Sequence, residues 1–290
     1  MENSAFVIEG SRLVKCTDPD LEEIIVPEGI TEIGEGAFWC HRSLKRLLLP
    51  AGVTAIGDDA FWDCTALEEL HLPAGLLCIG NGAFSECAAL EELHLPEGLV
   101  SIGQGAFLNC RKLKSPLLPK SLREIGPRAF AKCWNIRQRW RVHKENPWIR
   151  TEGALLLTAN GREVLHCRPW AKGEILVPEG VERIRRGAFF ACVRVTNVLF
   201  PPGLRAIEEV AFADCGSLRK ICLPEGLEEL GRCAFADCVS LRQANIPLFI
   251  SKIPEGAFSG CISLDQVSLP DTLTEIGEGA FYECDFQPFA

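Results

Sequence analysis

The sequence contains no apolar run that approaches the roughly 20 residues needed to cross a bilayer as a helix. Its first ten residues, MENSAFVIEG, also lack the basic and hydrophobic segments that direct export. No membrane span is therefore expected. Two alternatives stay open for localisation: the cytoplasm, if the chain is complete as given, or secretion to the cell surface, if a signal peptide was removed ahead of Met1.

Positive charge is scarce as well. Thirty Lys and Arg residues face 39 Asp and Glu residues, which leaves a formal net charge of -9. Such a balance repels phosphate backbones and anionic lipid, so no nucleic-acid partner is expected. The content of 47% hydrophobic and 24% charged residues is typical of a soluble protein with a well-formed core.

Motifs of catalysis and metal binding are missing from the sequence. It contains no Gly-x-Ser-x-Gly, no Gly-x-x-x-x-Gly-Lys and no His-Glu-x-x-His, and no Cys-x-x-Cys pair of the kind that binds zinc. The five His residues and the dispersed carboxylates form no cluster along the chain. We therefore predict a protein that is not an enzyme, with no cofactor and no metal.

What the sequence does have is a repeat. ALEELHLPAGL at residues 66–76 returns as ALEELHLPEGL at residues 89–99, and the dipeptide Ala-Phe recurs every 23 residues with one step of 59. A fixed period of about 20 to 50 residues is typical of stacked supersecondary units, and this one lies in the leucine-rich-repeat range. The Ala residues of the dipeptide are Ala37, Ala60, Ala83, Ala106, Ala129, Ala188, Ala211, Ala234, Ala257 and Ala280.

The spacing within one unit predicts its local structure. Ala60, Cys64 and Leu67 stand at i, i+4 and i+7, which indicates a short helix. Leu70 and Leu72 then alternate with polar residues, which indicates a strand with one buried face. The expected fold is thus an α/β solenoid of 23-residue coils, with one short strand per coil in a parallel sheet and short helices opposite.

The 59-residue step holds an insert. Residues 154–167, ALLLTANGREVLHC, place two apolar runs around Asn160 and Gly161, which predicts a β-hairpin with a type I′ turn. The start of the chain, AFVIEGSRLVKC, has a shorter version of the same pattern. We therefore expect a single solenoid over residues 1–290, built by duplication of residues 1–145 as 146–290, with the stack continuous through the join.

The repeat LEELHLPAGLLCIGNGAFSEC at residues 67–87 closely resembles the BspA-like leucine-rich repeats of bacterial and protozoan surface proteins. The resemblance extends over nearly the whole chain. It implies adhesion, host or matrix contact and other binding roles, and no shared catalytic residues. The first unit departs from the pattern, because Cys40 comes one residue early and leaves His41 in the position of the repeat cysteine.

Most of the 15 cysteines belong to the repeat. Nine occupy one position that is expected to face the core, where a free thiol packs as a small hydrophobic group. Stacked side chains that point the same way are poorly aimed for disulfides, so we expect these thiols to be reduced. They are Cys64, Cys87, Cys110, Cys133, Cys192, Cys215, Cys238, Cys261 and Cys284. Cys222 falls in an outward strand position instead. It is interpreted as an incidental surface thiol, with a reactive thiol as the alternative.

The outward middle position of the strand is the candidate binding face. It carries several apolar residues in one column, which indicates a contact surface. The alternative is a surface whose residues have varied without any binding role. His71 and His94 stand in it beside Glu69 and Glu92, and a solvated row is favoured there over a metal or pH-sensitive patch. The candidate binding residues are Leu48, Glu69, His71, Glu92, His94, Leu117, Trp140, Arg141, Leu176 and Leu199.

At the join, residues 134–148 read WNIRQRWRVHKENPW. Basic residues among aromatic ones are typical of surfaces that bind single-stranded nucleic acid or glycan. A structural role is the favoured interpretation, with Trp filling the gap in the stack and Arg lying over the rings.

The predicted function is that of a non-catalytic binding or adhesion module that recognises a protein or glycan through its strand face, as bacterial-type surface proteins do. The alternative is an intracellular protein-interaction scaffold of the same fold, which the many unpaired thiols favour. The oligomeric state is left open.

Overall fold

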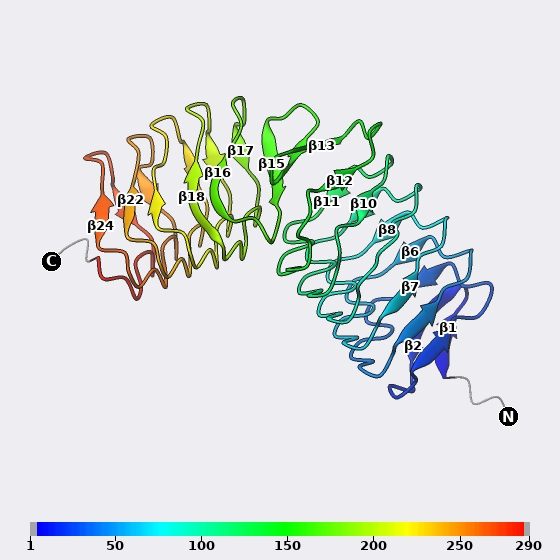
Figure 1. Ribbon diagram of the computed structural model, residues 1–290. Coiled ribbons are helices and arrows are strands. Elements are labelled where there is room, and N and C mark those ends of the chain that lie inside the picture. The colour runs from blue at the N-terminus through cyan, green and yellow to red at the C-terminus, as the bar shows by residue number, and fades with distance from the viewer. Residues whose placement is uncertain (1–4, 287–290) are drawn as a thin grey trace. The chain divides into compact units, whose positions relative to one another are not determined.

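The computed structural model describes residues 5–286 as stacked coils (Figure 1). The chain divides into two compact units, residues 1–149 and 150–290. This boundary lies close to the one expected from the internal duplication. The continuation of one stack through the join stays a prediction.

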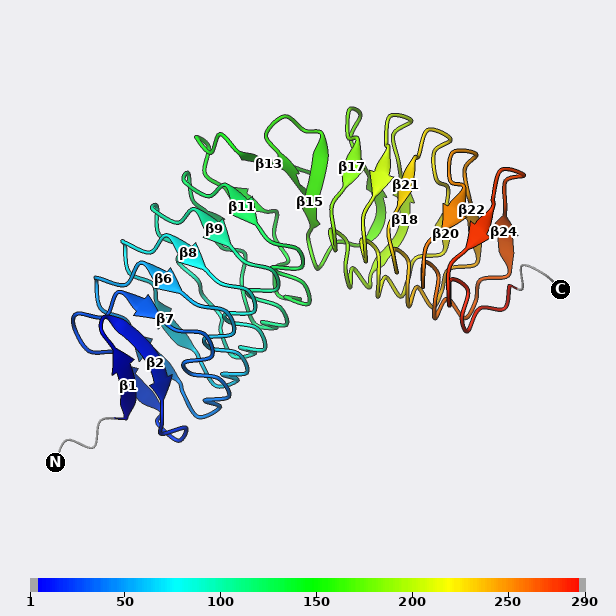
Figure 2. The ribbon, with the colours of Figure 1, turned by 180° about the vertical axis from the view of Figure 1, so that it is seen from behind.

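The first unit begins with an antiparallel hairpin, β1 (Phe6–Glu9) and β2 (Arg12–Cys16). Each coil then contributes strands to two rows. The first-row strands are β3 (Glu23–Ile25), β5 (Arg46–Leu48) and β7 (Glu69–His71), with β10 (Leu117–Leu118) and β12 (Arg141–Val142) as a further parallel pair. The second-row strands extend the hairpin in parallel (Figure 2): β4 (Glu32–Ile33), β6 (Ala55–Ile56), β8 (Cys78–Ile79), β9 (Ser101–Ile102) and β11 (Glu124–Ile125).

The second unit repeats this plan. Its second row runs through β13 (Ile149–Glu152), β14 (Leu155–Thr158), β15 (Glu163–Cys167), β17 (Arg183–Ile184), β19 (Ala206–Ile207) and β21 (Glu229–Leu230), and β23 (Lys252–Ile253) pairs with β25 (Glu275–Ile276). Its first row is one five-stranded parallel sheet: β16 (Gly173–Leu176), β18 (Val195–Leu199), β20 (Lys220–Ile221), β22 (Gln243–Asn245) and β24 (Gln266–Ser268).

The prediction of short helices is wrong. Residues 5–286 contain no helix, and hence none able to cross a membrane. In the first coil Gly36 and Cys40 have φ of 59° and 60°, so only three residues around Phe38 lie between two left-handed ones. An α-helix needs a longer run of right-handed residues to close its i to i−4 hydrogen bonds. The Ala-Phe segment is therefore a tight turn, and we call the series of these turns the turn row.

Hydrogen bonds to the next coil hold the turn row together. Phe38 N donates to Ala60 O at 2.7 Å, and Cys40 N donates to Trp62 O at 2.8 Å. Between them Trp39 N donates to Gly36 O within the turn, at 3.0 Å. Alternate amides thus bond within a coil and between coils, so the turn row is a third ladder beside the two rows of strands. The expectation of one strand per coil was also incomplete, since most coils contribute two.

A ladder of phenylalanines fills the core of each unit. In the first unit successive rings stack with centroids 4.8–5.4 Å apart, and in the second they stack at 4.5–5.5 Å. An edge-on aromatic ring closes each ladder at its last coil: Trp140 against Phe130, and Phe286 against Phe281. Burial of these rings is a large share of the hydrophobic stabilisation of each coil.

The repeat cysteines form a second buried ladder beside the phenylalanines. All nine are buried, as the sequence predicts. Eight thiols donate to the Phe carbonyl of the preceding coil over Sγ–O distances of 2.9–3.3 Å, from Cys64, Cys87, Cys110, Cys133, Cys215, Cys238, Cys261 and Cys284. The position thus suits a small apolar group that also donates a hydrogen bond. In the first coil His41 takes this place, buried edge-on against Phe38.

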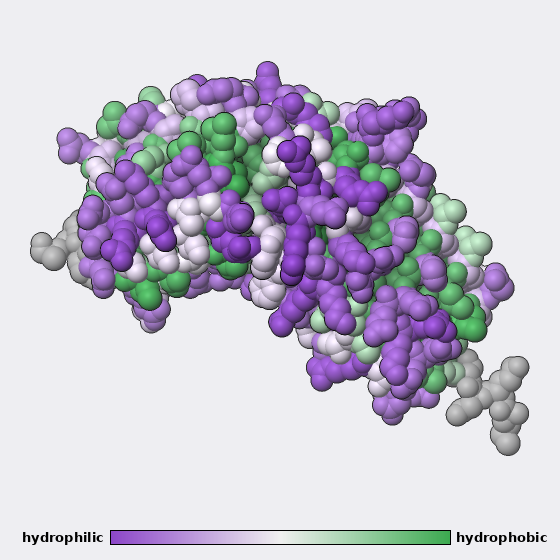
Figure 3. Space-filling model, in the orientation of Figure 1, coloured by the Kyte–Doolittle hydropathy of each residue, from purple (hydrophilic) through white to green (hydrophobic). Residues whose placement is uncertain are grey.

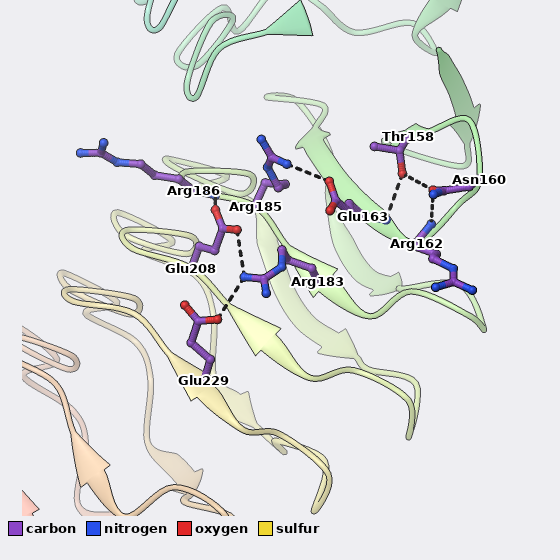
Figure 4. A network of polar contacts seen from close by, with 9 residues as sticks. All are labelled: Thr158, Asn160, Arg162, Glu163, Arg183, Arg185, Arg186, Glu208 and Glu229. Atoms are coloured by element: carbon purple, nitrogen blue, oxygen red, sulfur yellow. Dashed lines mark hydrogen bonds and ion pairs between the residues drawn. The ribbon is translucent and has the colours of Figure 1, made fainter. Parts of the chain in front are cut away.

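The hairpin predicted around Asn160 is formed by β14 and β15, but its turn is not of type I′. That turn needs positive φ at both central residues, and only Gly161 has it, at 73°. The loop has four residues, 159–162, and Asn160 organises it with its side chain (Figure 4). Asn160 Oδ1 accepts from Arg162 N at 3.0 Å and from Thr158 Oγ1 at 2.7 Å.

The burial of the cysteines predicts their reactivity. Burial raises the pKa of the Cys64 thiol to about 12, so it is not a thiolate at neutral pH. Native protein should label chiefly at exposed Cys222, with slower labelling at half-buried Cys40, Cys78 and Cys233. Unfolding in denaturant without reductant should raise the count close to 15. A denatured count near zero would show disulfides instead.

Glycine is required where the coils approach closely. A Cβ at Gly103 would lie 2.5 Å from Asn81 N and from Gly80 C of the previous coil. Gly103→Ala should therefore lower the free energy of unfolding by about 1 to 3 kcal/mol, the usual range for overpacking. Gly203→Ala is the matched control, because no heavy atom lies within 4 Å of a Cβ there. Equal effects of the two substitutions in chemical denaturation would contradict this account.

Candidate binding face

The outward residues of the first-row strands lie in register, as the candidate face requires. Ile25, Leu48 and His71 are lateral neighbours on β3, β5 and β7, and Leu117 lies beside Arg141 on β10 and β12. The Ile25 side chain is 72% exposed, and Leu48 and Leu117 are 39% exposed. An apolar pair on β3 and β5 is therefore open to solvent.

The two histidines are not strand neighbours. His71 ends β7, whereas His94 lies in an extended segment that is not part of a strand. The adjacent carboxylates are also engaged: Glu69 accepts from Arg46 Nε at 2.9 Å, and Glu92 pairs with Lys114 Nζ at 3.1 Å. Within residues 5–286 no group of three or more His, Cys, Asp or Glu side chains is placed to hold a metal.

Charges alternate along the edge of this face. Arg46 bridges Glu23 and Glu69 over 2.9 Å contacts, and Lys114 bridges Glu91 at 2.8 Å and Glu92 at 3.1 Å. Exposed pairs of this kind contribute about 0 to 1 kcal/mol each, so they orient side chains more than they stabilise the coils. Lys114 lowers the pKa of Glu91 by a hydrogen bond and by its charge.

The second unit carries a different face. Leu176 and Leu199 are neighbours on β16 and β18, with 69% and 43% of their side chains exposed. Towards β24 the face becomes polar, and a shallow depression of about 580 Å³ lies there. Its lining mixes polar and apolar residues: Lys220, Ile221, Cys222, Gln243, Ala244, Asn245, Asp265, Gln266, Val267, Ser268 and Phe286. Figure 3 likewise shows hydrophobic residues as separate patches within a mostly polar surface.

Asn245 has a structural role within this depression. Its Oδ1 accepts from Leu223 N at 2.7 Å, and its Nδ2 donates to Leu223 O at 2.9 Å. The amide thus replaces a backbone partner between two coils. Gln243 and Gln266 are exposed and lie in register on β22 and β24.

Trp140 does not lie on the candidate face. Only 3% of it is exposed, and its ring packs edge-on against Phe130 with centroids 5.7 Å apart. Arg141 is therefore the outward residue of this coil. Arg111 lies over Trp134 at 5.6 Å and Arg123 over Trp148 at 5.0 Å, which supports the structural interpretation of the tryptophan-rich segment, with arginines supplied by earlier coils.

One aromatic pair at the surface was not among the residues expected from the sequence. Trp39 and Trp62 follow the Ala-Phe dipeptide in the first two coils, and their ring centroids lie 5.7 Å apart. The Trp39 side chain is 59% exposed. The signal was present in the sequence, because a large aromatic residue in the same position of two successive coils must form a surface pair.

Comparison with known families identifies the repeat. The model of the BspA type leucine rich repeat region matches residues 14–137 and 173–288 in six copies. The chain therefore belongs to the BspA-type leucine-rich-repeat family, as its resemblance predicts. This is a repeat family, and the match indicates no catalytic one. A search of curated proteins found no match.

Three solved structures illustrate the likeness. A leucine rich cell surface protein from Faecalibacterium prausnitzii A2-165 is 25% identical, with 91% of this chain and 86% of that chain covered and a TM-score of 0.64. A leucine-rich repeat protein from Eubacterium ventriosum is 19% identical, with 96% and 90% covered and a TM-score of 0.76. The pneumococcal vaccine antigen PcpA is 22% identical, with 93% and 70% covered and a TM-score of 0.66. The last two show likeness of fold alone.

The burial of Trp140 gives a test of the last coil of the first unit. Trp140→Ala should lower the free energy of unfolding by on the order of 3 kcal/mol, because it leaves a cavity beside the final ring of the phenylalanine ladder. Trp148→Ala is the control, with an expected cost below about 1 kcal/mol, since that side chain is 47% exposed.

The same denaturation curves test the continuity of the stack. A single transition is expected if coils couple through the join, because repeat arrays unfold cooperatively when each coil contacts its neighbours. Two transitions in the unmodified protein would show that the units unfold independently.

Proposed function

We propose that the chain is a non-catalytic binding or adhesion module that recognises a protein partner through the first-row strands. The observation that carries this proposal is the exposed apolar column of Ile25 and Leu48, bordered by the charges of Glu23, Arg46 and Glu69. Apolar anchors within a polar rim are the usual anatomy of a protein interface. Leu176 and Leu199 give the second unit an anchor of the same kind.

A glycan is the second candidate partner. The depression on β20, β22 and β24 supports it, because the amide and hydroxyl groups of Gln243, Gln266 and Ser268 suit the hydroxyl groups of a sugar.

The proposed location is the cell surface, as for the protein from F. prausnitzii whose name places it there. The alternative, an intracellular scaffold, is favoured by the fifteen free thiols, since disulfides are rare in reducing compartments.

The strand-face proposal predicts a one-sided pattern of mutations. Once a partner has been selected from protein and glycan arrays, Leu48→Lys and Leu199→Lys should each weaken binding by more than about 1 kcal/mol, the range of an interface anchor. The melting temperature should change little, because both side chains are exposed.

Glu283→Lys is the matched control on the turn row, since Glu283 is exposed and Lys132 occupies the same position of its own coil with nearly the same φ. Asp63 and Glu86 are less suitable controls because they hold Arg42 and Asn109. Equal losses on both sides, or a loss at Glu283 alone, would reject the strand face as the binding site.

A further inference from the structure

A hollow of about 460 Å³ lies on the turn row of the first two coils, away from the strand face. It is lined by Glu35, Gly36, Trp39, Asp59 and Trp62. The two indole rings are tilted by 41° to each other, with centroids 5.7 Å apart. The hollow therefore offers exposed aromatic surface with carboxylates at its border.

Those carboxylates lack a cation. Within the described part of the chain, the side chains of Glu35 and Asp59 make no ion pair, and no Lys or Arg lines the hollow. The neighbouring Asp58 is satisfied by Asn81, whose N and Nδ2 donate to it at 2.7 Å and 2.9 Å. Partial burial, followed by the charges of Asp58 and Glu35, raises the pKa of Asp59. The border of the hollow is thus uncompensated negative charge.

The second unit shows what the scaffold places at this position. Its Arg186 and Glu209 stand at the positions of Glu35 and Asp58, counted from the Ala-Phe dipeptide. There Arg186 Nη2 pairs with Glu209 Oε1 at 3.2 Å. Figure 4 shows a second contact of the same arginine, in which Arg186 N donates to Glu208 Oε2 at 2.8 Å. The following two coils repeat the pattern with Arg232 and Glu255, paired at 2.7 Å. In the first unit the guanidinium is replaced by a carboxylate.

The aromatic residues change together with the charge. Trp39 and Trp62 correspond to Phe190 and Ala213 in the second unit, so the paired surface aromatics occur where the internal cation is missing. A cation within about 6 Å of an indole face is attracted by the negative ring face, and nearby carboxylates add to this attraction. An uncharged sugar would gain from the rings but not from the net charge.

We propose that the hollow bordered by Glu35, Trp39, Asp59 and Trp62 binds an organic cation, namely an alkylated ammonium group. Two sources have this chemistry: a small quaternary ammonium ion, or a lysine or methylated lysine side chain on a peptide. This site is separate from the strand face and does not depend on the partner proposed there.

The test is a titration followed by the indole N–H resonances of ¹⁵N-labelled protein at constant ionic strength. Tetramethylammonium chloride should shift the signals of Trp39 and Trp62 with saturation in the millimolar range, whereas tert-butanol, a neutral group of similar shape, should not. The signal of Trp148 is the internal control, because Arg123 already covers that ring.

Variants separate charge from shape. Glu35→Gln and Asp59→Asn should each weaken tetramethylammonium binding by at least about threefold, while Glu28→Gln, an exposed acid elsewhere, leaves it unchanged. Glu35→Arg should abolish binding with both indoles intact, because it restores the internal cation of the second unit. Folding of each variant is checked by its thermal midpoint.

The source of the cation is read from a second titration. An acetylated peptide containing trimethyllysine that binds at least about tenfold more tightly than tetramethylammonium indicates a peptide partner, and equal affinities indicate a small ion. Equal shifts with tert-butanol, binding of methyl glucoside in place of the cation, no effect of the charge variants, or no indole shift at all would each overturn the proposal.

Discussion

Backbone hydrogen bonding between successive coils is the constraint on which the rest of this structure depends. Each coil has amides that bond to the coil beside it, in two rows of strands and in the turn row, so a residue lies against its counterpart 23 positions away. Side chains at one position then form a column, and any column inside the stack must tolerate contact with itself. Phe and Cys satisfy that condition in different ways, by ring stacking and by a thiol donating to a carbonyl.

The same constraint separates structural from variable positions. Inside the coil, a change at Gly103 or Phe107 affects contacts to the coils on either side. On the outer surface, side chains at one repeat position need only avoid unfavourable contacts with their counterparts on the adjacent coils. Leucine, histidine, arginine and cysteine therefore all occur in the outward position of the first-row strands. Recognition can therefore diverge from coil to coil without loss of the fold, which is why repeat scaffolds suit binding.

The period, the hairpins and the buried cysteines follow from the sequence, because the period and the cysteines rest on spacing and the hairpins on two apolar runs around a glycine-containing turn. The helices did not, since Ala60, Cys64 and Leu67 are also buried when the chain makes a tight turn between left-handed Asp59 and Asp63, and spacing does not report φ. The two-residue strands of the second row are too short to give any alternation. At the candidate site, the sequence placed Leu48 outward correctly but not Trp140, because one extra residue near the join shifts which side chain faces the core.

The charge at the turn row shows how duplicated units come to differ in what they bind. Arg186 and Glu209 form an ion pair across two coils of the second unit, so each of these two charges has a partner within the protein. With Glu35 in place of the arginine, the corresponding surface of the first unit leaves a negative site beside the exposed indole of Trp39 and the half-buried one of Trp62. Because these side chains lie on the surface, the exchange has little effect on the buried ladders of phenylalanine and cysteine. Changes at a few positions, from Arg186, Phe190 and Ala213 in one unit to Glu35, Trp39 and Trp62 in the other, thus turn an internal ion pair into the proposed binding site while the coil beneath stays the same.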